Sequence, residues 1–586
     1  MITVKHAIAK TRGLKVRHLI HFFLLFLLIL VLRLFYLQIE NGGTFSKLGE
    51  KNFLRMEIIP PLRGDVYDCK QVLLAANRPI FDLYWHGMGR GTLAAHDQEV
   101  LSKIGEVLSA DFLQNPKRRS IEYAEKYSRR VLLKGDVSFA QLCQISEQCA
   151  DAQCLVVAHR FKRVYPHATL ASHVLGYLNR GESVGQSGIE QHFQAALQGQ
   201  EGRLLQVINS TGKMLAQKVY KEAKAGSDII LTLDFQLQKL AEDIFQPDQS
   251  GAFILMDPED GAIRTLVSYP HFDPNLFLNP LSRQDWEKLM LHNPLINRAT
   301  SAVYPPASTF KLVTLAAGLE EKVINVNSEI QCNGHIKFCG RKYFCMNHLG
   351  HGKLTPKEAI AVSCNITCFH IAQKLKVDQL AEYARRFGLG RKTNFLLPEK
   401  PGLVPTIAWK KAAKGERWWK GETLSTGIGQ GYLQVTPLQV ACMVSAICTE
   451  NLVRPRLLEH ELVEKEKVDL APETLMFLRS GMKEAVENGS ARKLKRIKGF
   501  DVYAKTGTAQ TVSLDHEQIY KHQLEHGWVV GYFYYEKTRK PLTFIAFVEN
   551  AGSSTPAMQI ADKFLRGYRD LMEAAARDVH NDGAMC

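Results

Sequence analysis

The sequence is most informative first through what it does not contain. Residues 1–18 include no aspartate or glutamate, no second apolar run of membrane-spanning length follows Leu37, and there is no internal repeat or low-complexity tract. The absence of repeats argues against a solenoid or propeller, and the lack of a second apolar run argues against a multi-span channel or transporter. No basic-aromatic module and no long Lys/Arg run accompany the net charge of +15, so we expect no nucleic-acid partner. Attraction to an anionic membrane or wall stays open.

The N-terminal segment predicts a membrane anchor. Its only apolar run, Leu19–Leu37, is close to the ~20 residues needed to cross a bilayer. The cations precede it, at Lys5, Lys10, Arg12, Lys15 and Arg17. This asymmetry predicts a cytoplasmic tail over residues 1–18, a transmembrane helix over residues 19–38, and export of the remainder. Because no A-x-A-like cleavage site follows the run, we favour an uncleaved single-pass anchor over a signal peptide.

Size and composition fit an exported multi-domain protein. The chain has 586 residues, of which 46% are hydrophobic and 23% charged, so a large core and more than one domain are expected. It has 12 cysteines, but a chain of this length does not depend on a disulfide scaffold. Some of the cysteines are therefore expected to be buried as small apolar residues.

Apolar patterning predicts an α+β fold. Ala252–Met256 and Ala262–Ser268 form a predicted hairpin, two further strands are expected at Trp528–Tyr535 and Leu542–Val548, and the intervening sequence is mostly helical in pattern. The two ends of this region are thus expected to assemble one antiparallel sheet flanked by helices. We assign residues 39–235, with charged helices such as Ile121–Arg130, to an elongated pedestal or dimerisation domain. Residues 236–575 form the catalytic domain, and residues 576–586 a tail.

The motif Ser308-x-x-Lys311 is the first candidate for catalysis. Tyr304-Pro305-Pro306-Ala307 precedes it and an apolar helix follows, so Ser308 is expected at a helix N-terminus with Lys311 on the same face. A serine hydroxyl becomes a good nucleophile when a base removes its proton, and a desolvated lysine of lowered pKa can be that base. The spacing alone is weak evidence. It also occurs at Ser210…Lys213, Ser480…Lys483 and Ser490…Lys493.

Two further motifs support Ser308. The triplet Ser363-Cys364-Asn365 lies at the junction of two predicted helices, where a serine can relay a proton and an asparagine can bind a substrate amide and the lysine. The run Lys505-Thr506-Gly507-Thr508 continues a predicted strand, where lysine and threonine can hold a carboxylate and glycine admits a substrate backbone. The backbone N–H groups of Ser308 and Thr508 would form an oxyanion hole. Each motif alone is weak, but the three in this order are a specific signature of active-site serine enzymes that react with penicillin.

On these residues the chain resembles the class B penicillin-binding proteins, and more closely their elongation type. The resemblance also covers Arg63-Gly64-Asp65-Val66-Tyr67-Asp68, where Cys69 and Gln71 replace the usual Arg and Gly, and Gly188-Ile189-Glu190 of the pedestal. Ala307 stands where glycine is common. The segment Gly429-Gln430-Gly431-Tyr432 is similar to the elongation-type version.

The resemblance implies a function. It implies a peptidoglycan D,D-transpeptidase of the inner membrane, with a periplasmic catalytic domain that acts in elongation and shape maintenance without a cofactor. It implies wall stem peptides as substrates, β-lactams as inhibitors, and a multi-span glycosyltransferase as partner. The catalytic residues would be Ser308, Lys311, Ser363 and Asn365, and the substrate-binding residues Lys505, Thr506, Gly507 and Thr508. The alternatives are a β-lactamase or D,D-carboxypeptidase, against which the long pedestal and the anchor argue, and a non-catalytic sensor or scaffold, against which the intact motifs argue.

Cysteine and histidine crowd together between the first two motifs. Cys332, Cys339, Cys345, His348, His351 and Cys364 all lie in one short stretch, and thiolate with imidazole is a donor set that zinc prefers. By resemblance, Cys345, His351 and Cys364 match a zinc pattern of some elongation-type relatives, with Cys332 as the fourth candidate. A structural zinc is one interpretation, and a Cys332–Cys345 disulfide or reduced buried thiols are the others.

Overall fold

The computed structural model describes residues 2–179, 184–208, 214–510 and 523–582, and its chain separates into two compact units. Unit 1 comprises Met1–Leu62, Arg78–Lys162 and Gly199–Ala225. Unit 2 comprises Arg63–Asn77, Arg163–Gln198 and Gly226–Cys586. Unit 2 thus includes three segments of the range 39–235 that the sequence assigns to the pedestal, namely 63–77, 163–198 and 226–235, so the predicted domain boundaries remain predictions.

Unit 1 begins with the apolar helix. Helix α1 (Ile2–Phe35) runs into a short π-helical turn (Tyr36–Glu40), and the segment Arg17–Glu40 is long and apolar enough to cross a membrane. The apolar side chains of this helix from Leu19 to Phe35 are exposed rather than packed in a core, as expected of a lipid-facing segment. Helix α2 (Gly42–Phe53) follows.

The rest of unit 1 contains two small sheets. Strand β1 (Leu54–Ile59) pairs with β6 (Gly202–Ile208), which pairs with β7 (Met214–Lys221), all antiparallel. The apolar core of unit 1 forms where helices pack against three strands. These strands are β4 (Arg130–Val137), β5 (Leu155–Val164) and the later part of β3 (Leu73–His86). These helices are α3 (Ala95–Leu108), α4 (Lys117–Lys126) and α5 (Phe139–Gln148). The predicted helix Ile121–Arg130 is wrong at both ends. Pro116 caps α4 at its N-terminus, Ser128 adopts a left-handed backbone beyond its end, and Arg130 already begins β4.

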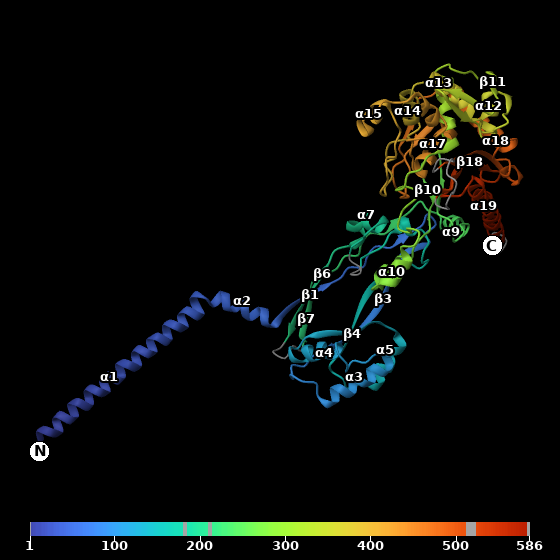
Figure 1. Cartoon of the computed structure of the whole chain (residues 1–586). Coiled ribbons are helices and arrows are strands. Elements are labelled where there is room, and N and C mark those ends of the chain that lie inside the picture. The colour runs from blue at the N-terminus through green and yellow to red at the C-terminus, as the bar shows by residue number, and fades with distance from the viewer. Residues whose placement is uncertain (1, 180–183, 209–213, 511–522, 583–586) are drawn as a thin grey trace. The chain divides into compact units, whose positions relative to one another are not determined.

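Unit 2 is built on one five-stranded antiparallel sheet in the order β10-β9-β19-β18-β17. Two of its strands, β10 and β18, are labelled in Figure 1. The strands are β9 (Gly251–Met256), β10 (Ile263–Tyr269), β17 (Phe500–Ala509), β18 (His526–Tyr535) and β19 (Pro541–Val548). Strands from the two ends of the unit meet where β9 pairs with β19. The predicted α+β class, the hairpin and the two C-terminal strands are confirmed.

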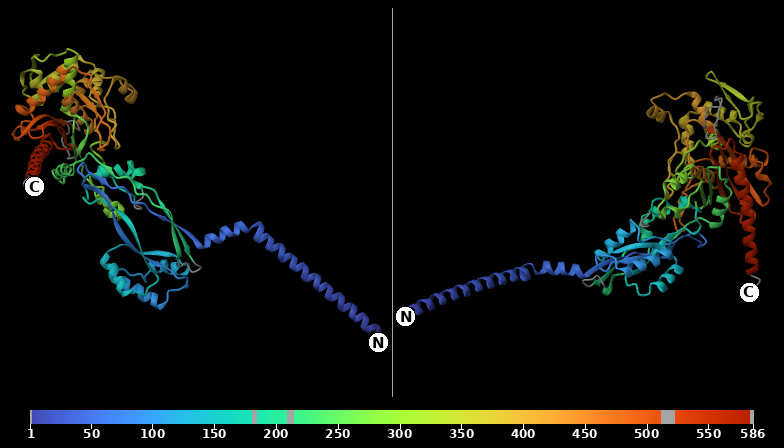
Figure 2. Two further views of the ribbon diagram at one scale, coloured as in Figure 1. Left: turned by 180° about the vertical axis from the view of Figure 1, so that it is seen from behind. Right: turned by 60° about the horizontal axis from the view of Figure 1, so that its bottom comes forward.

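Both faces of this sheet are buried. Alternate residues of a strand point to opposite faces, so Ile254 and Met256 join one apolar core while Phe253 and Leu255 join another. The second core is closed by α9 (Phe235–Asp243) and the long C-terminal helix α19 (Thr555–Asp582), drawn in red in Figure 2. Because both faces are covered, the strands read as continuous apolar runs.

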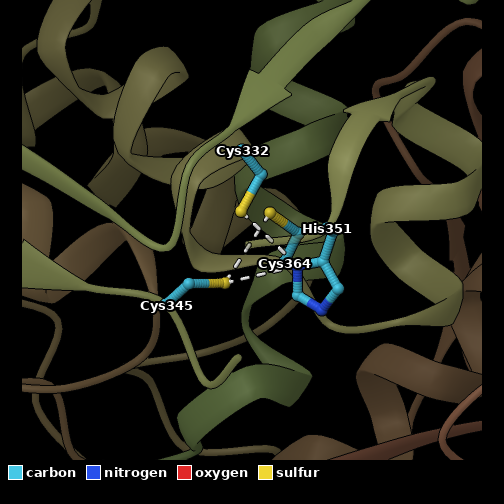
Figure 3. Close-up of side chains that lie close together, drawn as sticks. All are labelled: Cys332, Cys345, His351 and Cys364. Atoms are coloured by element: carbon cyan, nitrogen blue, oxygen red, sulfur yellow. Dashed lines mark hydrogen bonds between the residues drawn. The ribbon is translucent and has the colours of Figure 1, made fainter. Parts of the chain in front are cut away.

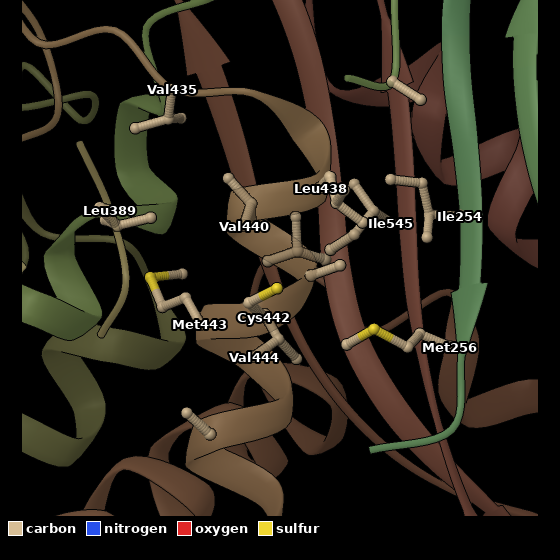
Figure 4. Packing of buried hydrophobic residues seen from close by; sticks show 14 of the residues in the cluster. Ile254, Met256, Leu389, Val435, Leu438, Val440, Cys442, Met443, Val444 and Ile545 are labelled. Carbon is tan, nitrogen blue, oxygen red and sulfur yellow. The ribbon is translucent and has the colours of Figure 1, made fainter. Parts of the chain in front are cut away.

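The first core is filled by α17 (Pro437–Thr449), which is buried almost all round. In Figure 4 Leu438 of this helix lies beside Ile545 of the sheet, and Met443 lies on the side of the helix toward Leu389. A helix apolar on every face needs neighbours on every side. The surrounding helices are α11 (Lys311–Glu320), α12 (Pro356–Ala361), α13 (Asn365–Lys374), α14 (Val377–Arg386), α15 (Ile407–Lys414), α16 (Lys420–Gly427) and α18 (Pro472–Glu487). These helices carry the residues of the first two motifs to the edge of the sheet at β17.

Short elements complete unit 2. Strand β11 (Ile330–Cys332) pairs with β14 (Gly352–Leu354), β12 (His335–Phe338) pairs with β13 (Arg341–Phe344), and β15 (Asn451–Val453) pairs with β16 (Lys465–Lys467). The short strands β2 (Val66–Tyr67) and β8 (Ile229–Ile230), and helices α6 (Ser172–Leu175), α7 (Gly188–His192), α8 (Gln194–Gln198) and α10 (Arg283–Leu289), also belong to it. Glu190 of α7 accepts from both Arg63 and Arg163, each at 2.7 Å and buried, so segments far apart in sequence share one ion network.

The turn after Asp68 shows how the chain accommodates its departure from the family pattern. Asp68 is buried, and its carboxylate accepts from the backbone N–H groups of Lys70 and Val72. Gln71 stands where glycine is usual and has φ +65°, a left-handed conformation that favours glycine. The turn is therefore formed with backbone strain at Gln71.

Candidate active site

Ser308 lies in a tight turn at the edge strand of the sheet. It is the middle residue of a 3₁₀ turn, Ala307–Thr309, and α11 begins at Lys311 just beyond. Ser308 was expected at the N-terminus of a helix, and in the structure it lies in the 3₁₀ turn that directly precedes α11. Ser308 is part-exposed, and its hydroxyl has no hydrogen-bond partner within the residues that the structure describes.

The backbone around Ser308 is held under strain. Ala307 has φ +51°, and its N–H donates to the carbonyl oxygen of Gly429 at 2.9 Å. A Cβ on Gly429 would lie 2.0 Å from the Ala307 oxygen, so only glycine permits this approach. Non-glycine residues in this region cost on the order of 1–3 kcal/mol and collect at functional sites. Gly429 therefore holds the turn that carries Ser308 in this conformation.

Two buried lysines converge on one hydroxyl. The Lys311 ammonium donates to Ser363 Oγ at 3.1 Å, to the Ser363 carbonyl at 2.7 Å and to Asn365 Oδ1 at 2.6 Å. The Lys505 ammonium donates to the same Ser363 Oγ at 2.9 Å and to the Thr506 carbonyl at 2.9 Å. Four predicted catalytic and binding residues from three separate segments are thus brought into one cluster. We refer to Lys311, Ser363, Asn365 and Lys505 as the lysine cluster.

The lysine cluster has no carboxylate to hold its charge. Burial lowers the pKa of Lys311, and burial together with the neighbouring Lys311 lowers the pKa of Lys505 well below its usual range. No ion pair to either amine is found among the described residues, and both side chains are almost completely buried. Since two ammonium groups on one hydroxyl repel each other, a neutral amine is favoured at this site.

Ser363 and Asn365 are fixed by the helix junction. Ser363 has φ +57° between α12 and α13, and Asn365 is the first residue of α13. Asn365 also donates from Nδ2 to the carbonyl of Phe344 at 2.9 Å. Its amide therefore links the Lys311 amine to the hairpin β12–β13, which the sequence alone does not indicate.

The Lys505-Thr506-Gly507-Thr508 segment lies on β17, whose outer edge is unpaired by strands in the part of the chain described. Gln430 Nε2 donates to the Thr508 carbonyl at 3.4 Å, so that carbonyl points away from β18. Because the N–H and C=O of a strand residue point to the same side, the Thr508 N–H faces the same open edge. An extended peptide could pair along this edge.

Gly507 also packs against the turn that carries Ser308. A Cβ there would lie 3.2 Å from Thr309 Cγ2 and 3.3 Å from the Pro306 oxygen, so the missing side chain makes room for the Ser308 turn itself.

The other three S-x-x-K matches in the sequence differ from one another in where they lie. Ser480 Oγ donates to the Phe477 carbonyl within α18, and Ser210…Lys213 lies outside the described residues. Ser490, dismissed from sequence, accepts a hydrogen bond from Thr506 Oγ1 at 2.8 Å. The S-x-x-K spacing in the sequence does not indicate that Ser490 contacts Thr506.

Figure 3 shows a cluster of three thiols and one imidazole. It lies beside the lysine cluster, because the Asn365 N–H donates to Cys345 Sγ at 3.4 Å. The ligand atoms of Cys332, Cys345, His351 and Cys364 all lie within 4.8 Å of one another. His351 Nδ1 is 3.5 Å from Cys332 Sγ and 3.6 Å from Cys345 Sγ, and the Cys345 and Cys364 sulfurs are 3.9 Å apart. The predicted set is brought together, and its cysteines are free thiols rather than a Cys332–Cys345 disulfide.

The distances fit a tetrahedral metal. With Zn–S bonds of about 2.3 Å, neighbouring sulfurs of a tetrahedral site lie about 3.8 Å apart. Three thiols and one imidazole supply the four donors that a closed structural zinc site uses. Cys339 and His348, also noted in the sequence, are not part of this set.

An antiparallel sheet with a helical block, and a lysine cluster beside a strained serine turn at its edge strand, define the class of active-site serine acyl-transferases. Residues 251–566 match the family model of the penicillin binding protein transpeptidase domain, and residues 58–231 match that of the penicillin-binding protein dimerisation domain. The chain therefore belongs to the penicillin-binding protein transpeptidase family, as the sequence predicted, and the reaction of this family needs no cofactor.

Named relatives and solved structures support this family assignment. The chain is 30% identical over 580 residues to the peptidoglycan D,D-transpeptidase MrdA of Acinetobacter baumannii, covering 91% of this chain and 84% of that one. It is 26% identical to MrdA of Escherichia coli, covering 92% of each. Among solved structures, the penicillin-binding protein PBP2 of Helicobacter pylori in complex with MreC has a TM-score of 0.75 at 27% identity, covering 88% of this chain and 99% of that one.

Proposed function

We propose that the chain is an elongation-type peptidoglycan D,D-transpeptidase that cross-links wall stem peptides through an acyl-enzyme on Ser308. The observation that carries this proposal is the convergence of two buried amines of lowered pKa on Ser363 Oγ, beside the Ser308 turn. The names of the relatives support the same activity.

In the first half of the reaction, Ser308 Oγ attacks the carbonyl carbon of the penultimate D-Ala of a donor stem. Neutral Lys311 accepts the hydroxyl proton, and Asn365 keeps the amine oriented through its 2.6 Å hydrogen bond. The backbone N–H groups of Ser308 and Thr508 stabilise the oxyanion, a contribution of ~10²–10³ in rate for each such donor. The peptide C–N bond then breaks.

Ser363 completes the proton transfer. Its hydroxyl contacts both Lys311 and Lys505, so it can pass the proton to the departing amine of the terminal D-Ala. The terminal carboxylate of the donor would favour the protonated form of the Lys505 amine, which can then hold it, and Thr506 and Thr508 supply hydroxyl groups on the same strand. In the second half an amine of a neighbouring stem attacks the ester carbonyl, the C–Oγ bond breaks, and the proton returns to Ser308.

The cysteine and histidine cluster would hold a structural zinc. Cys364 lies between Ser363 and Asn365, and the Asn365 N–H donates to Cys345 Sγ at 3.4 Å. A zinc bound by Cys332, Cys345, His351 and Cys364 would tie the loop Cys332–His351 to the start of α13. Its contribution would be to position Ser363 and Asn365, with no part in the acyl transfer itself.

The anchor and its basic flank support the proposed location. Residues 1–18 would stay in the cytoplasm because their cations are retained there, and the catalytic domain would lie in the periplasm. One solved relative is a complex with MreC, and another, at 30% identity and TM-score 0.71, belongs to a peptidoglycan synthase complex that coordinates polymerization and crosslinking. We propose a multi-span glycosyltransferase as the partner of this chain.

Intact-mass analysis after exposure to a β-lactam tests the proposal. Wild-type protein should gain the mass of one opened β-lactam, stable over minutes and mapped to the peptide containing Ser308, and Ser308→Ala protein should gain none. Rapid loss of the adduct would indicate a hydrolase, and an adduct on another residue would refute the assignment of Ser308. Ser480→Ala is the matched control, because Ser480 has the same S-x-x-K spacing but lies within α18.

A further inference from the structure

A second site lies at the far end of α13 from the lysine cluster. A cavity of about 740 Å³ opens there between α13, α14, α15 and α16, which belong to the same helical block of unit 2 (Figure 1). Five of its lining residues are cations, and we call it the basic cavity. They are Lys374, Lys376, Lys411, Arg417 and Lys420. Among the described residues that line it, the only carboxylate is that of Glu416.

The positive charge of the basic cavity is not compensated by the protein. None of the five cations forms an ion pair with a described residue, and the Arg417 guanidinium lies over the ring of Trp419 at 3.9 Å. The acids nearby are already engaged. Glu416 lies 3.4 Å from the buried Lys410 ammonium, and Glu422 pairs with the same amine. Five like charges around one cavity repel each other, so an anionic ligand would be attracted.

The walls suit an organic anion more than a lone inorganic ion. Leu375, Val377 and Ile407 provide apolar surface, and the indole of Trp418 forms part of the lining. Trp418 is held in place, because its Nε1 donates to Thr423 Oγ1 at 2.8 Å. A cavity of this volume with fixed apolar walls and a few charged groups has the character of a ligand site. Ammonium and guanidinium groups bind carboxylates through charge-assisted hydrogen bonds.

Helix α13 sets the distance to the candidate active site. Its first residue, Asn365, belongs to the lysine cluster, and its last, Lys374, lines the basic cavity. Ten residues at 1.5 Å each span about 15 Å. An extended peptide of about five residues spans at most ~17 Å. The distance between the two places therefore matches the length of one short extended peptide.

We propose that the basic cavity binds the carboxylates of a wall stem peptide whose chain reaches the Ser308 turn. This inference rests on the proposed function, and it names the part of the substrate that these residues recognise. The cations fix the acidic side chains of the stem, and the walls near Trp418 contact its aliphatic parts. A β-lactam, which is too short to span the distance, gains nothing from the cavity.

The test uses full-length Ser308→Ala protein, which cannot be acylated. Calorimetry measures the binding of a synthetic stem peptide with free carboxylates, the same peptide with its side carboxylates amidated, and inorganic phosphate. Adding Lys374→Gln and Lys411→Gln should weaken binding of the carboxylated peptide about tenfold and leave the amidated peptide within twofold. The control pair Lys537→Gln and Lys540→Gln, on the exposed turn between β18 and β19, removes the same charge and should change neither.

Each outcome decides the proposal. Unchanged binding in the cavity pair, or an equal loss in the control pair, overturns it, since the second result would mean long-range attraction by the net charge. Phosphate that displaces the carboxylated peptide at similar concentration also overturns it, because the cavity would then be a simple anion site. The cavity pair is also made with Ser308 intact, and its acylation by penicillin should match wild type. Failure of that acylation in wild type would refute the proposed function separately.

Discussion

Replacing Gly507 by alanine should slow acylation by moving the Ser308 turn. The new Cβ would lie 3.2 Å from Thr309 Cγ2, 3.3 Å from the Pro306 oxygen and 3.3 Å from Trp528 Cβ. Ordinary contacts between non-bonded carbons are about 3.5–4.0 Å, so something must shift by a few tenths of an ångström. Trp528 is completely buried in the sheet, which leaves the turn carrying Ser308 as the part that moves.

The size of the effect follows from two terms. Inserting a methyl group into a packed site costs about 1–3 kcal/mol of stability. A displacement of 1 Å in an active site costs ~10²-fold in rate, so a few tenths of an ångström should cost about three- to tenfold. The turn is stiff, because Thr309 Oγ1 donates to the Pro306 carbonyl at 2.7 Å and Trp528 Nε1 donates to the Pro305 carbonyl at 3.1 Å. The displacement is therefore transmitted to Ser308 rather than absorbed.

The assay is the second-order rate of acylation by a fluorescent penicillin, measured beside the thermal midpoint of unfolding. Gly507→Ala should acylate three- to tenfold more slowly and melt at a lower temperature. The control Gly49→Ala lies in α2, where a Cβ would meet nothing within 4 Å, and should acylate at the wild-type rate. An unchanged acylation rate in Gly507→Ala would refute the packing argument.

Three further predictions concern charge, metal and backbone. Because burial lowers the pKa of Lys311, its base form is populated as pH rises, so the acylation rate should rise with pH through that lowered pKa and then level off; a rate that falls over this range would contradict Lys311 as the base. Wild-type protein should contain about one zinc ion per chain by elemental analysis, and Cys345→Ser should contain less and unfold at a lower thermal midpoint. The control Cys143→Ser, at an exposed cysteine, should change neither the zinc content nor the midpoint. Equal zinc in the two variants would exclude the site. Gln71→Gly should raise the free energy of unfolding by up to about 1 kcal/mol, read from the denaturant midpoint, because Gln71 has φ +65° and glycine adopts this conformation without strain; a lower midpoint would show that lost chain entropy outweighs the strain.

The sequence indicated the parts of the fold that depend on local pattern. Continuous apolar runs marked β9, β18 and β19 because these strands are buried on both faces, and the hairpin turn between β9 and β10 was evident from Asp257–Gly261. The boundaries of α4 were misplaced because the helix starts after Pro116, where the apolar pattern is weak. Local pattern therefore identifies elements better than it identifies their ends.

Motif order also allowed the sequence to nominate Ser308, Lys311, Ser363 and the Lys505 strand, because few families combine these residues in this order. The donor set of the zinc candidate was nominated in the same way. In each case chemistry and resemblance suggested the residues without indicating how they contact one another. The four nominated catalytic and binding amines and hydroxyls stay a prediction until acylation is measured.

The contacts themselves were decided by tertiary structure. Lys311 and Ser363 are 52 residues apart and Lys505 and Ser363 are 142 apart, and no local rule connects residues at such separations. The sequence determined the chemical groups, the anchor and the strands, since these follow from side-chain type and short periodicity. Only packing around α17 and the five-stranded sheet determined that two lysines share one hydroxyl, that Ser490 bonds to Thr506, and that five cations surround one cavity. Burial then lowers the pKa of the lysines, because desolvation depends on what surrounds a residue in space and not on its neighbours along the chain.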